Sequence, residues 1–478
     1  MIFSKLYLGI LALQHLSGAI NASRLLFRGG TIIGWNEEKQ SLEVTRKGSL
    51  FVSDDRIVDV YADGEEPAEV VNASDIEIVN ATNKILTPGF IDTHRHNWQT
   101  LWRTCNGNNT LWDLFYHRYN SAVQGAIQPE DIYNAQLLSI YEGLSVGVTT
   151  QLDHAHHAFS KAHAEAGLAA SIDSAGSLEE RASHFREIAI LRRNALDASP
   201  ATLVLSFDEF QLSRDAVQPL IDLVRDEDIP VLTTHLVGGP YGYKTIRLHD
   251  LGILNTSMAV VFSHGSFLGS NSYQLLKSIN QYVSICIESE MSYAQSNPTA
   301  HLWLDQASVG MDATFLASGD ILTQARILLQ FIRNRLNTPM TPEQAFLLST
   351  RSGGLALRRP DLGIIAAGAK ADILIWGTEN LALLGWRDPV AAIILHANPA
   401  DIQDVLIDGV FKKRDGRLLA PGLDAAKEKF LETVTRAQDV VLTTPSYEFH
   451  EGDQHVNGAK LGLLPMVDVT RGHGDGYV

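Results

Sequence analysis

The 478-residue sequence has only two cysteines, no cluster of basic residues and no long apolar run. Two cysteines are too few for a disulfide-stabilised scaffold, and a chain of this length buries a core without one. Cys105 and Cys286 fit either one disulfide or two buried thiols. A formal net charge of −17 without clustered Lys or Arg argues against a nucleic-acid partner. We therefore expect a globular protein with a small-molecule partner.

Residues 1–22 have the pattern of a secretory signal peptide. An apolar run at 6–13 follows Lys5, and the small residues Ser17 and Ala19 fit a cleavage site. The run is too short for a membrane span, and the alternative is an N-terminal strand or buried helix. Glycosylation sequons, which agree with secretion, occur at Asn21, Asn72, Asn80, Asn108 and Asn255. We expect a secreted glycoprotein with no membrane span.

The rest of the chain divides into a β unit and a larger region of alternating strands and helices. Short β-rich pieces separated by Gly, Asn and Asp turns fill 24–85 and 361–418, which predicts one β unit built from both segments. Residues 86–360 predict an inserted α/β (β/α)8 barrel. Residues 419–478 begin with an amphipathic helical stretch and end in a Gly-, His- and Asp-rich tail. The expected barrel strands are ILTPGFIDTH, GVTTQLDH, GLAASIDSAG, ATLVLSFDE, IPVLTTH, MAVVFSH, QYVSICIES and ASVGMD.

Most of these strands are apolar until their C-terminal end, where His, Asp or Glu stands. Side chains alternate along a strand, so His94 and His96 in PGFIDTHRH point to one side while Arg95 points to the other. The other strand-end residues that we single out are His235, His264 and Asp312. Each alone is more often a hydrogen-bonded structural residue. In a barrel, however, the C-terminal ends of the strands share one face, where these side chains would converge.

Imidazoles and one carboxylate form a ligand set that suits zinc or iron and leaves a coordination position open for water. A divalent metal lowers the pKa of a bound water to about 7. Asp312 can then accept the water proton and pass it to a leaving group, and His264 can position the hydroxide or stabilise an oxyanion. The pattern predicts a hydrolase with one divalent metal ion, Zn²⁺ or Fe²⁺.

Six of these segments stand in the order found in a known family. PGFIDTHRH, GVTTQLDH, TTHL, FSHG, VGMD and the later GAKADILIWG with VLIDG resemble the amidohydrolase superfamily, in the branch of cytosine deaminase and the triazine chlorohydrolases. The resemblance spans residue 24 to about residue 418 and implies a metal-bearing barrel with a composite β-sandwich. Homo-oligomers are common in the family, although no segment here indicates one. The metal ligands that the resemblance implies are His94, His96, His235 and Asp312, with His264 as the strand-six histidine.

Two departures from the family pattern affect the expected chemistry. Binuclear relatives carry a carboxylated Lys at the end of strand four, which ATLVLSFDEF lacks, so we expect one metal; Asp208 or Glu209 as a bridging carboxylate is the alternative. Deaminases of this branch place a Glu three residues after the strand-five His, where Gly238 stands here. We therefore favour hydrolysis of an amide, lactam or amidine bond. The alternatives are a deaminase of a heterocycle or amine, a lyase such as a decarboxylase, and a non-catalytic binding protein.

Substrate contacts in a barrel usually come from the loops that follow the strands. We expect them from five residues, and for each the alternative is a structural role. They are Arg95, Trp98 and Gln99 after strand one, His154 in DHAHHAF after strand two, and Glu288 in ESEMSY at strand seven.

Overall fold

The structure is a computed structural model that describes residues 24–105, 121–155, 202–208, 213–227, 229–237, 245–252, 257–293 and 299–445, with isolated positions in 182–189 and at 254, 295 and 297. Several expectations lie outside these residues. They are the signal peptide, three sequons, the third barrel strand, Glu209, Gly238 and the tail after 445.

The described chain forms two compact units, and the first is a β unit. It contains residues 24–89, Ile364–Pro389 and Asp401–Leu419. Its strands form one nine-stranded sheet in the order β17-β16-β15-β14-β5-β1-β2-β3, with β4 paired to β1. Apolar side chains of both chain segments share its core, among them Phe27, Leu50, Ile373 and Leu406. The elements are β1 Arg24–Asn36, β2 Ser41–Ser53, β3 Arg56–Tyr61, α2 Ala68–Val71, β4 Ile76–Asn80, β5 Lys84–Pro88, β14 Ile373–Gly377, β15 Ile402–Ile407, β16 Val410–Arg414 and β17 Arg417–Leu418.

The expected first barrel strand, ILTPGFIDTH, is two strands in the structure. Lys84–Pro88 pairs with β1 and β14 in the β unit, whereas Phe90–His96 forms β6 of the barrel. The change falls at Gly89, whose N–H donates to the carbonyl of Asp372, while the N–H of Phe90 donates to Gly147. Pro88, which has no N–H, ends the first ladder.

The second unit is the barrel, whose described strands are all parallel to their neighbours. They form a three-stranded sheet, β13-β6-β7, and a five-stranded sheet, β12-β11-β10-β9-β8. The strands are β6 Phe90–His96, β7 Val148–Asp153, β8 Leu205–Ser206, β9 Val231–Leu236, β10 Ala259–His264, β11 Tyr282–Ile285, β12 Ala307–Val309 and β13 Asp312–Ala313. The helices are η1 Asn97–Trp102, α4 Ser121–Ala126, α5 Pro129–Ser145, α8 Arg214–Asp226, α9 Thr245–Asp250, α10 Ser270–Ser278, α11 Ile287–Ser292, η3 Ala300–Leu302, α12 Ile321–Arg335, α13 Pro342–Ser349, α14 Arg351–Ala356, η4 Ala392–His396 and α16 Leu423–Thr443, with short turns α15 Pro389–Ala391 and η5 Pro399–Asp401 at the unit boundaries.

The expected seventh strand ends earlier than its sequence predicts. β11 stops at Ile285, and the following residues, including Glu288, form α11. Cys286 is the N-cap of this helix, and its N–H donates to Glu290 Oε1 at 2.9 Å. A carboxylate that accepts the N–H of the capping residue stabilises the first helical turn.

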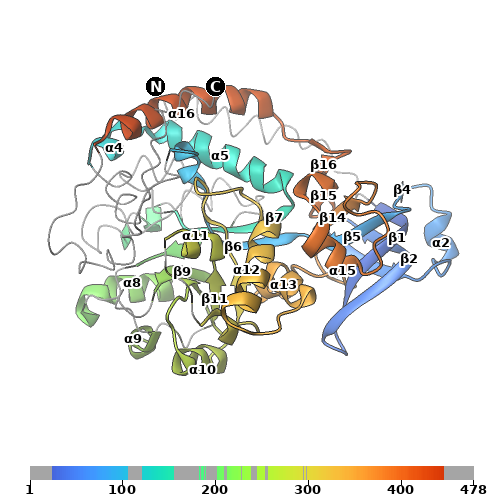
Figure 1. Cartoon of the computed structure of the whole chain (residues 1–478), viewed down its shortest axis with the longest axis horizontal. Helices are drawn as coiled ribbons and strands as arrows, with labels where there is room; N and C mark the ends of the chain where they lie inside the picture. The colour runs from blue at the N-terminus through green and yellow to red at the C-terminus, as the bar shows by residue number, and fades with distance from the viewer. Residues whose placement is uncertain are drawn as a thin grey trace. The chain divides into compact units, whose positions relative to one another are not determined.

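The C-terminal helix α16 lies along α5 and η1 within the barrel unit (Figure 1). It contains the amphipathic stretch expected from the sequence, and its Phe430 and Val434 pack in one apolar cluster with Trp98 and Trp102. Among the described helices, none is both long and apolar enough to cross a membrane.

Candidate metal centre

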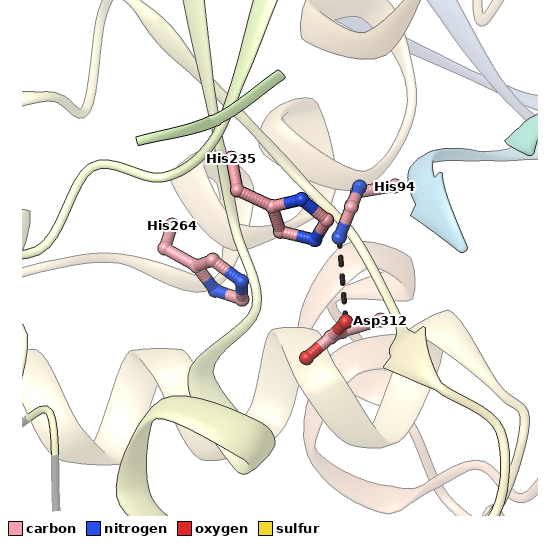
Figure 2. Close-up of side chains that lie close together, drawn as sticks. All are labelled: His94, His235, His264 and Asp312. Carbon is pink, nitrogen blue, oxygen red and sulfur yellow. Dashed lines mark ion pairs between the residues drawn. The ribbon is translucent and has the colours of Figure 1, made fainter. Parts of the chain in front are cut away.

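Polar side chains from several barrel strands lie close together, and Figure 2 shows four of them: His94, His235, His264 and Asp312. β6 contributes His94 and His96, β9 contributes His235, and β13 contributes Asp312. Asp312 Oδ1 lies 3.3 Å from Nε2 of His94 and 3.1 Å from Nε2 of His96. Nε2 of His96 is 3.3 Å from Nε2 of His235. Three imidazole nitrogens and one carboxylate oxygen therefore face a common point, and we call these four residues the inner set.

His264, the last residue of β10, adds a fourth imidazole beside the inner set. One ligand atom from each of His94, His235, His264 and Asp312 lies within 4.8 Å of the others. The rings of His235 and His264 are stacked with centroids 5.6 Å apart. His264 thus belongs to the cluster, although its separation from the inner set is wider than the separations within that set.

Each imidazole of the inner set is held at Nδ1, so its Nε2 is the nitrogen that faces the common point. For His94, His96 and His235, the Nδ1 partners are Ser263 Oγ at 2.7 Å, the main-chain oxygen of His154 at 2.7 Å and Asp208 Oδ2 at 2.8 Å. The carbonyl of His154 and the carboxylate of Asp208 can only accept, so the ring proton of His96 and of His235 is on Nδ1 and the lone pair is on Nε2. The Ser263 hydroxyl can accept the ring proton of His94 in the same way. Such partners fix the tautomer and orientation of metal-binding histidines.

The spacing of these donors fits one divalent metal ion. Ligand atoms that share a tetrahedral zinc at bond lengths of about 2.0–2.2 Å lie about 3.3–3.6 Å apart. The three separations given above, which are 3.1 to 3.3 Å, are close to this range. Nε2 of His94 is also buried with no hydrogen-bond partner among the described residues. A buried nitrogen in that state is costly unless a ligand satisfies it, so the inner set fits a metal.

The protonation states of the site suit a cation. Burial lowers the pKa of His94 well below 6.5 and lowers the pKa of His154 to about 4, so both rings are neutral at pH 7. Burial would raise the pKa of Asp312, but the imidazoles of His94 and His96 beside its Oδ1 outweigh burial and hold this pKa well below 3.8. Asp312 is therefore a carboxylate at neutral pH.

The main chain is strained at two of the cluster residues. Asp312 has φ +64° and His264 has φ +77°, in the left-handed region that side-chain-bearing residues rarely adopt. Two residues before Asp312, Gly310 passes so close to β6 that a Cβ there would lie 2.8 Å from the Cβ of His94. The strained main chain at Asp312 and the close approach at Gly310 together place Asp312 beside the histidines.

The three residues expected to contact substrate after strand one are all buried. Arg95 is fully buried, with Nε donating to Asn97 Oδ1 at 2.9 Å and Nη1 donating to Asp92 Oδ2 at 3.3 Å. The Trp98 ring lies 4.6 Å from that of Trp102 inside an apolar cluster, and Gln99 is buried on the same 3₁₀ helix, η1. These positions favour the alternative interpretation, a structural role beneath the first loop.

The other two expected contact residues have different surroundings. His154 is fully buried against the inner set, with Nδ1 3.2 Å from Thr233 Oγ1 and Nε2 3.3 Å from Asp208 Oδ2. Glu288 lies on α11, where its Oε2 accepts a hydrogen bond of 2.8 Å from Gln324 on α12. His154 therefore lies beside the centre and supports it, whereas Glu288 joins two helices.

Sequence reasoning did not find the groups that hold the imidazoles. Ser263 immediately precedes His264 in FSHG, and nothing in the sequence connects it with His94. Asp208 was expected at most as a bridging ligand, but its Oδ2 is bonded to Nδ1 of His235 and its Oδ1 accepts the His235 N–H at 2.7 Å. Its position at the end of strand four is the signal that could have suggested this role.

Comparisons with known proteins agree with the fold and the centre. A sequence model of the amidohydrolase family matches residues 85–412. The chain is 24% identical to the 5-methylthioadenosine/S-adenosylhomocysteine deaminase of Pyrococcus abyssi, over 85% of this chain and 98% of that protein. It is 26% identical to the 8-oxoguanine deaminase of Pseudomonas aeruginosa, over 79% of this chain and 92% of the relative.

Solved structures show the same fold. An adenosine deaminase from Xanthomonas campestris with bound zinc superposes with a TM-score of 0.75 at 19% identity, covering 87% of this chain and 99% of that one. The zinc complex of atrazine chlorohydrolase from Arthrobacter aurescens gives a TM-score of 0.69 at 16% identity, covering 86% and 100%.

The fold and the donor set define a metal-dependent hydrolase that acts on carbon–nitrogen bonds, with a divalent metal as cofactor. The chain belongs to the amidohydrolase family.

Proposed function

We propose that the protein holds one zinc ion on His94, His96, His235 and Asp312 and hydrolyses an amide, lactam or amidine bond of a small molecule. The observation that carries this proposal is the convergence of three imidazoles whose Nδ1 atoms are already bonded. Nε2 of His94 and of His96 lie 3.3 and 3.1 Å from the ionised Asp312, and Nε2 of His235 lies 3.3 Å from that of His96. A non-catalytic binding protein would be expected to have lost part of this set.

The residues of the chain supply the remaining steps of hydrolysis. When bound, the metal ion supplies a Lewis acid that makes water nucleophilic near neutral pH. Asp312 is ionised, so it can accept the proton of the attacking water and deliver it to the leaving nitrogen. His264 stands beside the inner set, where it can orient the water or stabilise an oxyanion.

Two observations bear on the kind of C–N bond. Gly238 stands at the position where deaminases of the resembled branch carry a Glu that protonates a ring nitrogen, which favours amide-type hydrolysis. Deamination of a purine-like heterocycle is the second candidate, because the relatives above are named as deaminases of adenine- and guanine-type compounds. A lyase reaction such as decarboxylation is the third, and it would release carbon dioxide without consuming water.

Product analysis separates these candidates. Zinc-loaded protein would be incubated with panels of secondary amides, lactams, amidines and heteroaromatic amines, and products identified by mass spectrometry. We expect products that have gained one water with no ammonia from the amides and lactams. Turnover confined to amines, with ammonia released, would replace the proposal by deamination. Asp312→Asn should abolish turnover, and Asp305→Asn is the matched control because Asp305 is a surface residue paired with Lys277.

We also propose that the protein is secreted and glycosylated, which the N-terminal pattern supports. Asn72 and Asn80, the two sequons within the described chain, are both exposed. Expression in a eukaryotic secretory host should give a mature N-terminus near residue 22 and a mass decrease on deglycosylation. An intracellular product that keeps residue 1 would contradict this.

A further inference from the structure

Glu290 is a fully buried carboxylate directly behind His264. Its Oε1 lies 3.5 Å from Nδ1 of His264, and this carboxylate is 0% exposed. A buried charge is costly unless it is paired and hydrogen-bonded. The N–H groups of Cys286 and Asn297 donate to the two carboxylate oxygens at 2.9 Å each. Nδ1 of His264 is buried with no hydrogen-bond partner among the described residues, and Oε1 of Glu290 is the polar atom 3.5 Å from it.

Asn297 holds the same histidine at its main chain. It is fully buried, and its Nδ2 donates both to Glu290 Oε2 at 2.9 Å and to the carbonyl oxygen of His264 at 3.0 Å. That carbonyl belongs to the residue with φ +77°. A left-handed histidine persists only where its surroundings hold it. Glu290 and Asn297 therefore contact His264 at the ring and at the strained main chain.

Capping of α11 explains only part of this arrangement. The cap requires one oxygen of Glu290, the one that accepts the Cys286 N–H. It does not require the second oxygen to bond Asn297, nor Asn297 to bond His264. A metal site on His264, Cys286 and Glu290, whose ligand atoms lie within 4.8 Å of one another, is also disfavoured. Burial and nearby carboxylates raise the pKa of the Cys286 thiol well above 9, so a thiolate ligand would be costly there.

We propose that Glu290 and Asn297 are positioning residues that orient His264, leaving its Nε2 for the reacting water and substrate at the inner set. The proposal deepens the proposed function and rests on it. Because Gly238 stands in place of the usual acid, charge stabilisation falls to imidazoles beside the inner set. His154 lies beside Thr233 and Asp208, so we assign this role to His264. A group that stabilises a developing charge must already be oriented when the reaction begins.

The test compares Glu290→Gln with Ser289→Ala in zinc-loaded protein. Ser289 lies on the same helix and its Oγ donates to the carbonyl of the same capping residue, Cys286, at 3.1 Å. It therefore controls for loosening of α11 without touching His264. Crystal structures of both variants would show the His264 ring directly, whatever the substrate is. Kinetics on an amide or lactam from the product screen would give kcat and KM separately.

In Glu290→Gln we expect the His264 ring to rotate or to occupy more than one orientation, with bound zinc unchanged. We expect kcat to fall about 10- to 100-fold while KM changes less than about twofold, as for other groups that orient a reacting residue. Asn297→Ala, which tests the main-chain contact if Glu290→Gln fails to fold, should change His264 in the same direction. An unmoved His264 ring in the folded variants would overturn the proposal, as would an equal loss of kcat in Ser289→Ala. If no substrate is found, the proposed hydrolysis fails. The orientation of the His264 ring in the variants still tests whether Glu290 and Asn297 position it.

Discussion

The buried polar groups on the two sides of strand β6 differ in their hydrogen bonding. We call the side of Arg95 the closed side and the side of His94 and His96 the open side. On one side, Arg95 donates to Asn97, Ser139, Asp92 and the carbonyl of Gly319, all within 3.3 Å. On the other side, Nε2 of His94 has no hydrogen-bond partner among the described residues and faces Asp312. Both sides are buried, so burial alone does not distinguish a structural from a functional group. The difference is whether the polar atoms are satisfied within the chain or left for a ligand.

The largest effect should come from removing the two histidines on the open side of β6. His94→Ala combined with His96→Ala removes two donors of the inner set, so we expect a loss of at least about 10³-fold in kcat/KM. The fold should survive, because Nε2 of His94 has no hydrogen-bond partner among the described residues and both rings face the metal site and not the apolar core. Circular dichroism and thermal melts of the variant should match those of metal-stripped wild-type protein. A variant that melts far below the metal-stripped wild type would mean that these histidines hold the fold.

Removing the Arg95 guanidinium from the closed side should lower the stability of the fold instead. Arg95→Met leaves Asp92 buried without its partner, although burial already raises the pKa of Asp92 to about 6. Loss of one member of a buried ion pair costs about 3–5 kcal/mol. We expect the free energy of unfolding in urea to fall by that amount. Zinc bound per folded chain should stay as in wild type, and loss of zinc without loss of stability would place Arg95 on the functional side.

A smaller effect is expected from Asp208, which belongs to the support of the open side. Asp208→Asn keeps the shape of the side chain but weakens the bond to Nδ1 of His235. Changes of this kind cost about 10- to 100-fold in metal affinity or activity. Competition with a chromogenic chelator measures the affinity. Unchanged affinity and activity would show that the main chain alone positions His235.

The smallest effect should come from Glu66 in the β unit, a carboxylate that is hydrogen-bonded within the chain. Burial opposes ionisation of Glu66, but hydrogen bonds from Ser49 and Arg28 lower its pKa. A carboxylate with a lowered pKa stabilises the fold above its unfolded pKa, near 4.3, and this contribution is lost as the pH falls through its folded pKa. Glu66→Gln should therefore reduce the pH dependence of unfolding below about pH 4.5, by about 1 kcal/mol, without changing zinc content. Urea titrations at pH 7 and pH 3.5 measure it.

The sequence predicted the barrel and the convergence of the histidines well, because both depend on simple geometry. Strand alternation places His94 and His96 on one side, and parallel strands bring His235 close to them. It did not predict which polar partners would fill the space behind them. The contact between His94 and Ser263 depends on how two strands pack, which no local pattern encodes.

The prediction that strand seven extends to Glu288 and beyond was wrong. The run before Glu288 reads as one strand because it is apolar and β-branched, but the chain turns into α11 at Cys286. The helix places Glu290 behind His264 and turns Glu288 towards Gln324. Glu288 and Glu290 are only two residues apart on α11, yet Glu288 bonds the neighbouring helix and Glu290 lies against His264.

The central claim is that the open side of β6 holds one metal ion. The direct measurement is metal per chain, by plasma mass spectrometry, on zinc-loaded wild-type protein and on the His94→Ala, His96→Ala double variant. We expect one zinc ion per wild-type chain and none in the variant. Two ions per chain, or zinc retained by the variant, would contradict the single site on His94, His96, His235 and Asp312.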